Sequence, residues 1–372
     1  MSSTIKKIEI TYNSINASNT FTNGDIVSGQ VSVEAAKDCQ ISSFYIKFKG
    51  KADVFWTETY GQNTYSYHAK DKYFSVRQYF IRDPNSKDDQ KTLIAHQSGE
   101  TYSNVVPPGI HVYPFSFQFP LQNIPSTFKG ADGKIVYLLE AVLSRSMRMD
   151  SKESTMINFV AKGDLNPVSG LMVPQQESKD KSLAFGSGNV SMDVHAKKMG
   201  YKLGEAMYVN IQINNASSRS VKPKFELYEK RSFFAQGQRK VQTRTILKEK
   251  SDVVEGRSGQ KMLTKIIAIP RELTPSILNC SILKLEYRLK VYLDIKCAAD
   301  PKVKLPIVIL PEDISRESGE IQPLPPARFG LEAFGNPNPQ TWGTTSPAMS
   351  PPPPYEASAM FPSFPSEYKT TL

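Results

Sequence analysis

One stretch alternates apolar with polar side chains without a break: Leu283-Lys284-Leu285-Glu286-Tyr287-Arg288-Leu289-Lys290-Val291-Tyr292-Leu293-Asp294-Ile295. Successive side chains of a β-strand point to opposite faces of its sheet, so one face of this segment is apolar throughout. The opposite face carries Lys284, Glu286, Arg288, Lys290 and Asp294. The pattern predicts a half-buried antiparallel strand over 282–295, with one face in the core and one in water.

The same two-residue period recurs through the first half of the chain. It predicts strands that contain Ile8, Ile10 and Tyr12, then Val27 to Val33, Phe44 to Phe48, Phe115 to Phe119, and Tyr137 to Leu143. Residues 57–104 are less regular, and we expect a hairpin and long loops there. No stretch keeps a helical period of 3.6, so the chain is predicted to be all-β, with short strands that form sandwiches.

Two parts of the chain repeat each other. Phe117-x-Phe119-Pro120-x4-Pro125-Ser126 returns as Ile267-x-Ile269-Pro270-x4-Pro275-Ser276, and Gly109 and Tyr137 return as Gly259 and Tyr287 at the same spacing. Phe21-x-x-Gly24-Asp25 returns as Tyr201-x-x-Gly204-Glu205 at a larger spacing, because extra residues fall within 57–104. The repeat predicts two related β-sandwiches in tandem.

Composition separates these lobes from what lies between and after them. Residues 163–189 are rich in Gly, Pro and charge and are predicted to be a linker. Half of the 26 prolines lie after residue 310, and a segment so poor in apolar residues is expected to be disordered. The predicted organisation is a first domain over 1–162, the linker 163–189, a second domain over 190–310 and a proline-rich tail over 311–372.

The tail holds one short motif, Ser350-Pro351-Pro352-Pro353-Pro354-Tyr355. Consecutive prolines adopt polyproline II, a preformed ligand for the aromatic grooves of WW domains. Pro352, Pro353, Pro354 and Tyr355 fit the PPxY form of that ligand. A stiff spacer that happens to end in tyrosine is the alternative, and the terminal tyrosine in an unstructured setting favours a docking peptide.

Charge and cysteine content limit the classes of partner. The net charge is +10, and residues 166–310 hold 25 Lys and Arg against 13 Asp and Glu. Lys197, Lys198, Lys222 and Lys224 are candidates for binding anionic lipid or phosphorylated tails, and protection of strand edges by lysine is the alternative. Nucleic acid is not an expected partner, because aromatic residues are not interleaved with the basic ones. Three cysteines favour a reduced, cytoplasmic protein. No apolar run reaches 18 residues, so any contact with membranes is expected to be peripheral.

No motif for catalysis is present. The four histidines are scattered, and none belongs to a metal-ligand or nucleophile motif, so we expect no enzyme, no metal and no cofactor.

Three further segments resemble the arrestin domain-containing proteins, the α-arrestins. They are Gly24-Asp25-x-Val27-x-Gly29-x-Val31, the segment from Gly50 to Glu58 that includes Trp56, and the segment from Pro275 to Tyr287. The resemblance covers the whole chain and implies two arrestin-like, immunoglobulin-type sandwiches. It also implies an adaptor that carries HECT-type ubiquitin ligases of the Nedd4 class, through their WW domains, to membrane-protein cargo at the plasma membrane and endosomes.

Members of this family commonly carry two PPxY motifs, whereas this chain has one. Pro325-Pro326-Ala327-Arg328 lacks the tyrosine, so we expect a single WW contact.

Two other functions remain open within the family. One is a redox-linked regulator like the thioredoxin-interacting branch, which uses a second-lobe cysteine where this chain has Glu255-Gly256-Arg257-Ser258. Cys280 and Cys297 flank the predicted strand, and at ~3.3 Å per residue an extended chain holds them beyond disulfide reach, so we expect both to be reduced. The other is an arrestin-fold sorting scaffold that recruits no ligase, against which the proline–tyrosine motif argues.

Overall fold

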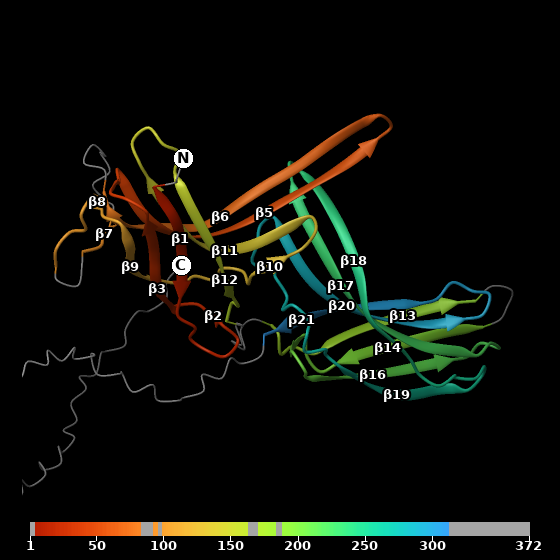
Figure 1. Cartoon of the computed structure of the whole chain (residues 1–372). Helices are drawn as coiled ribbons and strands as arrows, with labels where there is room; N and C mark the ends of the chain where they lie inside the picture. The colour runs from red at the N-terminus through yellow and green to blue at the C-terminus, as the bar shows by residue number, and fades with distance from the viewer. Residues whose placement is uncertain (1–3, 83–91, 96–98, 163–169, 184–187, 312–372) are drawn as a thin grey trace, which may run out of the picture. The chain divides into compact units, whose positions relative to one another are not determined.

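The strand predicted by the opening alternation is β20, Leu283–Ile295, in the computed structural model (Figure 1). Its apolar residues are buried in strict alternation, and Leu285, Leu289 and Val291 are fully enclosed. It pairs antiparallel on one side with β17, Val221–Ala235, and on the other with β21, Lys302–Leu310. The structure describes residues 4–82, 92–95, 99–162, 170–183 and 188–311.

The second lobe, residues 170–311, is a sandwich of two sheets. One has the strand order β15-β21-β20-β17-β18, and the other has the order β13-β14-β16-β19. Its remaining strands are β13 (Gln175–Ser182), β14 (Asn189–Ala196), β15 (Gly200–Lys202), β16 (Ala206–Asn215), β18 (Gln238–Lys250) and β19 (Gly259–Ala268).

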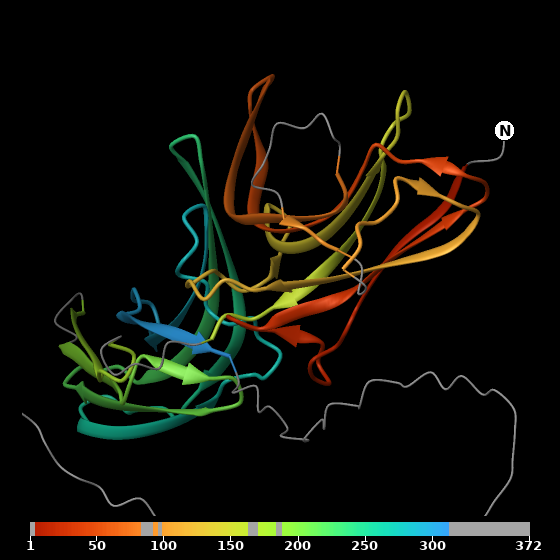
Figure 2. The ribbon, with the colours of Figure 1, turned by 90° about the vertical axis from the view of Figure 1, so that its left-hand side faces the viewer.

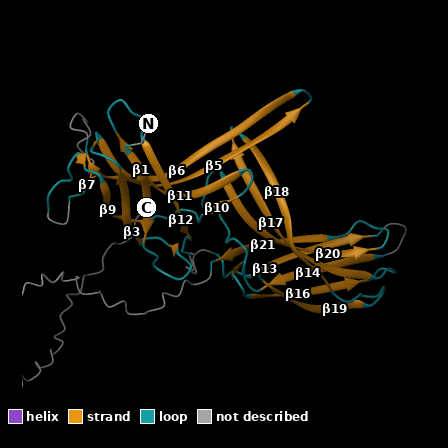
Figure 3. Ribbon diagram, in the orientation of Figure 1, coloured by secondary structure: helices purple, strands orange, loops and turns teal. Residues whose placement is uncertain are grey.

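The first lobe, residues 4–162, is built the same way. A three-stranded sheet, β1-β3-β9, faces a larger sheet in the order β2-β12-β11-β5-β6-β7, to which β10 is added beside β11, and β4 pairs with β8. Figures 2 and 3 show these strands, and no helix occurs among the described residues. The bounds are β1 (Ile5–Tyr12), β2 (Thr20–Phe21), β3 (Ile26–Ala35), β4 (Cys39–Gln40), β5 (Ser43–Tyr60), β6 (Asn63–Ile81), β7 (Thr92–Leu93), β8 (Val105–Val106), β9 (Gly109–Gln118), β10 (Phe128–Lys129), β11 (Gly133–Ser144) and β12 (Ser151–Phe159).

Each lobe contains a buried tyrosine whose hydroxyl bonds to a backbone carbonyl in an earlier loop. The hydroxyl of Tyr137 on β11 donates to the carbonyl of Pro125 at 2.6 Å, and that of Tyr287 on β20 donates to the carbonyl of Thr274 at 2.7 Å. In the first lobe this ring packs at 4.8 Å from Phe159, within a cluster of aromatic side chains. The Tyr137 hydroxyl thus satisfies a carbonyl that is buried away from water, and the Tyr287 hydroxyl satisfies one that is partly buried.

The turn that carries the second repeat is also duplicated bond for bond. The Asp25 carboxylate accepts from the amide of Thr22, and the Glu205 carboxylate accepts from the amide of Lys202, both at 2.9 Å. Gly24 and Gly204 adopt positive φ, of 82° and 77°, which only glycine takes without steric cost. The prediction of two related all-β sandwiches is therefore confirmed.

The hairpin expected within 57–104 is present, whereas part of the range predicted to be a linker forms a strand. Residues 63–81 form one continuous strand, β6, which pairs along nearly its whole length with β5 in a long hairpin. Most of β6 is solvent-exposed or half-buried on both faces, so the apolar alternation that marks a strand is missing there. Within the range predicted to be a linker, 163–189, residues Gln175–Ser182 form β13, which pairs antiparallel with β14. This strand is polar throughout. It is held by backbone hydrogen bonds to β14, and such bonds cannot be predicted from an apolar–polar pattern.

The described residues of the two lobes belong to one compact unit, and the lobes contact each other. One contact joins residues 279–281 of the second lobe to β6 and the β9–β11 connection. Asn279 donates to Asn123 at 2.7 Å, Tyr73 donates to the Cys280 sulfur at 3.2 Å, and Ser281 donates to Asp71 at 2.7 Å. A second contact places the Asp132 carboxylate against Lys240 and Gln242 of β18.

We predict that Tyr137→Phe destabilises the protein by about 1–3 kcal/mol, because the buried Pro125 carbonyl loses its donor while the ring still fills the core. The free energy of unfolding from denaturant titration measures the effect. Tyr60→Phe is the matched control, since the Tyr60 side chain is 61% exposed. An equal, small effect for both variants would show that the Tyr137 bond contributes nothing to stability.

Candidate functional site

The outer face of the five-stranded sheet in the second lobe is strongly basic. Because β20 turns its apolar side chains inward, its polar side chains lie on the outer face, next to those of β17, β18 and β21. The strand register aligns these side chains into rows that cross the sheet. Directly paired side chains on one face lie about 4.5–5.5 Å apart at Cβ, so each row is a line of near neighbours.

One row consists of Lys248, Glu226, Lys290 and Lys304, contributed in order by β18, β17, β20 and β21. The next row consists of Lys250, Lys224, Tyr292 and Lys302 from the same four strands. We call these eight residues the lysine rows. Like charges placed directly opposite repel one another, so a cluster of this kind needs anions, either internal or bound.

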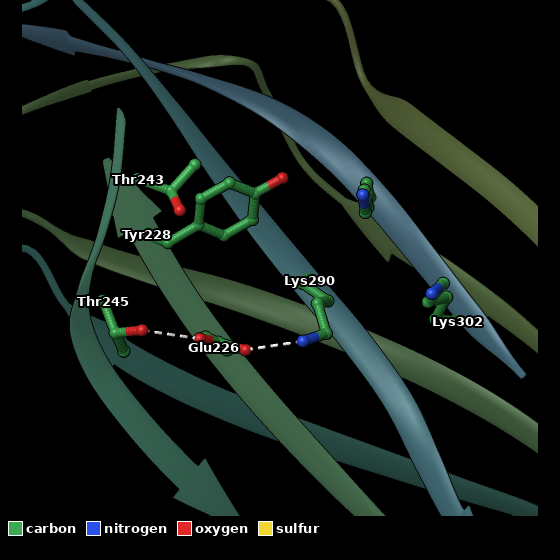
Figure 4. A pocket seen from close by; sticks show the side chains of 7 residues that line it. Glu226, Tyr228, Thr243, Thr245, Lys290 and Lys302 are labelled. Carbon is green, nitrogen blue, oxygen red and sulfur yellow. Dashed lines mark hydrogen bonds and ion pairs between the residues drawn. The ribbon is translucent and has the colours of Figure 1, made fainter. Parts of the chain in front are cut away.

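The internal anion of the first row is Glu226. Its carboxylate accepts from the Lys290 ammonium and from the Thr245 hydroxyl, both at 2.7 Å (Figure 4). It also lies 3.7 Å from the Lys248 ammonium. Burial raises the pKa of Glu226, but the bonds from Lys290 and Thr245 outweigh this effect and hold the pKa below its ordinary value. Glu226 is therefore ionised at neutral pH, and its charge is shared mainly with Lys290.

The second row is held by ring contacts and one ion pair. The ammonium groups of Lys290 and Lys224 lie 4.7 and 6.0 Å from the centre of the Tyr292 ring, within the range of a cation–π interaction. Lys224 also lies 2.6 Å from the Asp294 carboxylate. By contrast, the side chains of Lys302 and Lys304 are exposed, and their ammonium groups form no hydrogen bond or ion pair with any described residue.

A recess of about 260 Å³ opens among these side chains. Figure 4 shows Tyr228 and Thr243 on one side of it, Glu226 and Lys290 in the middle, and Lys302 on the neighbouring strand. All of its charged lining groups except Glu226 are cationic, and its hydroxyl groups can donate hydrogen bonds to an anion. The lining residues are Glu226, Tyr228, Thr243, Thr245, Lys290, Lys302 and Lys304.

The four lysines predicted from the sequence do not form one cluster. Lys222 and Lys224 lie on β17, with Lys224 inside the lysine rows. Lys197 and Lys198 follow the end of β14 in the other sheet, where Lys198 lies 2.5 Å from the Glu205 carboxylate. Lys197 and Lys198 share no contact partner with Lys222 and Lys224.

The sequence reasoning missed the residues that complete the site. Lys302 and Lys304 alternate with buried Val303 and Leu305, and this alternation is a strand signal that could have placed both lysines on a wet face. Glu226 could not have been found in this way, because its role depends on neighbours from two other strands, β18 and β20. The predicted docking residues Pro352, Pro353, Pro354 and Tyr355, like the rest of the tail after Pro311, lie outside the described residues.

The part of the chain that the structure describes has neither a cluster typical of a metal site nor a membrane-spanning helix. No group of three or more His, Cys, Asp or Glu side chains gathers there as a metal site would. No helix in those residues is long and apolar enough to cross a bilayer.

Comparison with known proteins matches both lobes. Residues 8–166 match the family model "Arrestin (or S-antigen), N-terminal domain", and residues 186–314 match "Arrestin (or S-antigen), C-terminal domain". The chain belongs to the arrestin family. Within it, the chain is homologous to the α-arrestins and is similar to arrestin domain-containing protein 4 of Mus musculus and of Homo sapiens. It is 28% identical to each over 292 residues, which is 78% of this chain and 68% of the relative.

A second group of similar proteins bears a different name. The chain is 26% identical to thioredoxin-interacting protein of Homo sapiens over 309 residues, which is 82% of this chain and 74% of that protein. These similarities make the chain an arrestin-family adaptor, a protein that binds cargo and other partners.

Low pH should lower the stability of the folded protein by protonating Glu226. The folded-state pKa of Glu226 lies below the ordinary value of 4.5, so its ion pair stabilises the folded state above that pH and is lost as the pH falls through the folded-state pKa. We predict that Glu226→Gln lowers the free energy of unfolding at pH 7 and flattens its decline below pH 4.5. Denaturant titrations from pH 7 to pH 3 measure both quantities, and parallel curves for the two proteins would contradict the prediction.

Proposed function

We propose that this arrestin-family adaptor recruits Nedd4-class HECT ubiquitin ligases to membrane-protein cargo through Pro352–Tyr355, and so promotes ubiquitination, endocytosis and endosomal sorting. The proposal is supported by the presence of two arrestin lobes and a complete PPxY motif in one chain. It places the protein in the cytoplasm, in peripheral contact with the plasma membrane and endosomes. No catalytic step is assigned to the chain itself.

The prolines and the tyrosine contribute to binding in different ways in this scheme. The prolines fix the backbone in advance, so little conformational entropy is lost on binding. Burying the Tyr355 ring in an apolar groove contributes roughly 1.5–3 kcal/mol. Phosphorylation of Tyr355 would bring about 1.5–2 negative charges to that groove and oppose docking.

We predict that Tyr355→Ala weakens co-precipitation of a Nedd4-class ligase by roughly ten-fold or more, since ~1.4 kcal/mol corresponds to a factor of ten. Ubiquitination of cargo should fall with it. Tyr368→Ala is the matched control, because Pro365-Ser366-Glu367-Tyr368 lacks the second proline. Thermal unfolding of the lobes should be unchanged in both variants. Equal recovery of the ligase with Tyr355→Ala and with wild type would mean that the ligase docks elsewhere.

The lysine rows suit the second task of an adaptor, which is to contact an anionic partner. Their cations lie on one sheet face, and the ammonium groups of Lys302 and Lys304 have no hydrogen-bond or ion-pair partner among the described residues. Anionic lipid headgroups and phosphorylated cytoplasmic tails of cargo both offer charges of the complementary sign. We propose that this face, with Lys222 beside it, binds such a partner. Lys197 and Lys198 remain a separate candidate site.

We predict that binding to vesicles containing phosphatidylserine, or to a phosphorylated peptide, weakens steeply as salt is raised, because the Debye length shrinks to ~8 Å at physiological ionic strength. The double variant Lys302→Gln, Lys304→Gln should lose most of this binding. The double variant Lys197→Gln, Lys198→Gln measures the contribution of the other candidate pair. Binding that is indifferent to salt would show that the charge serves solvation alone.

A redox-linked role is the second candidate, suggested by the similarity to thioredoxin-interacting protein. Against it, residues 255–258 contain no cysteine. The Cys280 side chain is buried and accepts a hydrogen bond from Tyr73, whereas Cys297 is exposed beyond the far end of β20. A reductant-sensitive complex with thioredoxin in cell lysate would favour this role over the ligase adaptor.

A further inference from the structure

A carboxylate of the protein already occupies the most basic part of the sheet face. Glu226 accepts hydrogen bonds from Lys290 and Thr245 inside the recess, and only 8% of its residue surface is exposed. An external anion that binds Lys290 must therefore take the place of this carboxylate or share its cation. Glu226 consequently opposes binding of any external anion.

We propose that Glu226 is an internal counter-ion that competes with the external anion, and thereby sets the affinity of the lysine rows for it. A ligand carboxylate that displaces Glu226 from Lys290 gains no new kind of bond and loses its own freedom of motion, so it binds poorly. A phosphate monoester carries about 1.5–2 negative charges and three strong acceptor oxygens at neutral pH. It can therefore outcompete Glu226 by reaching Lys302 and Lys304 as well.

The geometry favours a phosphorylated, extended peptide as the source of that phosphate. The recess is lined from four neighbouring strands, so a group on a side chain can enter it, whereas a planar bilayer surface meets only the protruding rim. Lys302 and Lys304 are two residues apart on β21, so their spacing is about 6.6–6.8 Å. Alternate residues of an extended peptide that runs along β21 have the same spacing, and phosphates on them would lie over the two lysines.

A second acid on the same face provides the control. Glu286 of β20 lies opposite Lys230, with 3.2 Å between their charged groups, and 3.6 Å from the Arg288 guanidinium. It does not line the recess. A general change in surface charge would affect the two positions alike, whereas competition inside the recess depends on Glu226 alone.

The test measures binding of the full chain to two fluorescent peptides of one sequence. One peptide carries phosphothreonine at two alternate positions, and the other carries glutamate there. A charged hydrogen bond contributes about 1.5–3 kcal/mol, so Glu226→Gln should tighten binding of the phosphopeptide roughly ten-fold or more. Binding of the glutamate peptide, weak in wild type, should become measurable. Glu226→Asp keeps the charge and Glu286→Gln lies outside the recess, so both should stay near wild type.

This inference rests on the proposed anion-binding face, and the two fail in different ways. If Lys302→Gln, Lys304→Gln leaves phosphopeptide binding unchanged, the face itself is wrongly assigned. If that variant weakens binding while Glu226→Gln, shown to be folded by its unfolding transition, does not tighten it, only the role of Glu226 is overturned. The same holds if Glu286→Gln tightens binding equally. A gain in binding seen only with phosphoinositide-containing vesicles, and not with the peptide, would overturn the choice of a peptide partner.

Discussion

The register of β20 against its neighbours is the constraint on which the second lobe depends. Side chains alternate between faces, so the same strand supplies the enclosed Leu289 to the core and Lys290 to the outer sheet surface. A slip of one residue would exchange the two faces, burying ammonium groups and exposing the core. The cost of that exchange fixes the pairing. The positions of the charged residues on the outer face are therefore as well defined as the packing within.

The sequence was sufficient for the features that repeat or alternate. Strands with one buried face were predicted because their pattern has a period of two, and the duplicated segments located both lobes. It was insufficient where structure depends on partners that are distant along the chain. The strand β6 extends past the core and has no apolar face to mark it, and β13 is polar from end to end. Nothing in the sequence around Glu226 distinguishes it from other acidic residues on strands, because its role depends on how β17 pairs with its neighbours.

The contacts between the lobes have a different character from those within them. Residues 279–281 reach the first lobe through side-chain hydrogen bonds, and Asp132 does so through Lys240 and Gln242. Most of these bonds are polar and partly exposed, so each contributes modestly to stability. The loop that makes the first contact lies directly before β20. The strand that carries the outer charges is therefore anchored to the neighbouring lobe at one end.

The bond-for-bond duplication has a consequence for how this scaffold tolerates change. Tyr137 and Tyr287 form matching bonds, yet the outward positions beside them differ. Val136 and Val142 on β11 are 5% and 2% exposed, whereas the corresponding residues of β20, Glu286 and Tyr292, lie among charged side chains. Matching outward positions thus carry buried apolar residues on β11 and polar residues on β20, although Glu140 of β11 also forms an ion pair with Lys49. The residues at outward positions can therefore change in either lobe, and with them the binding chemistry, while the inward residues that form the core stay the same.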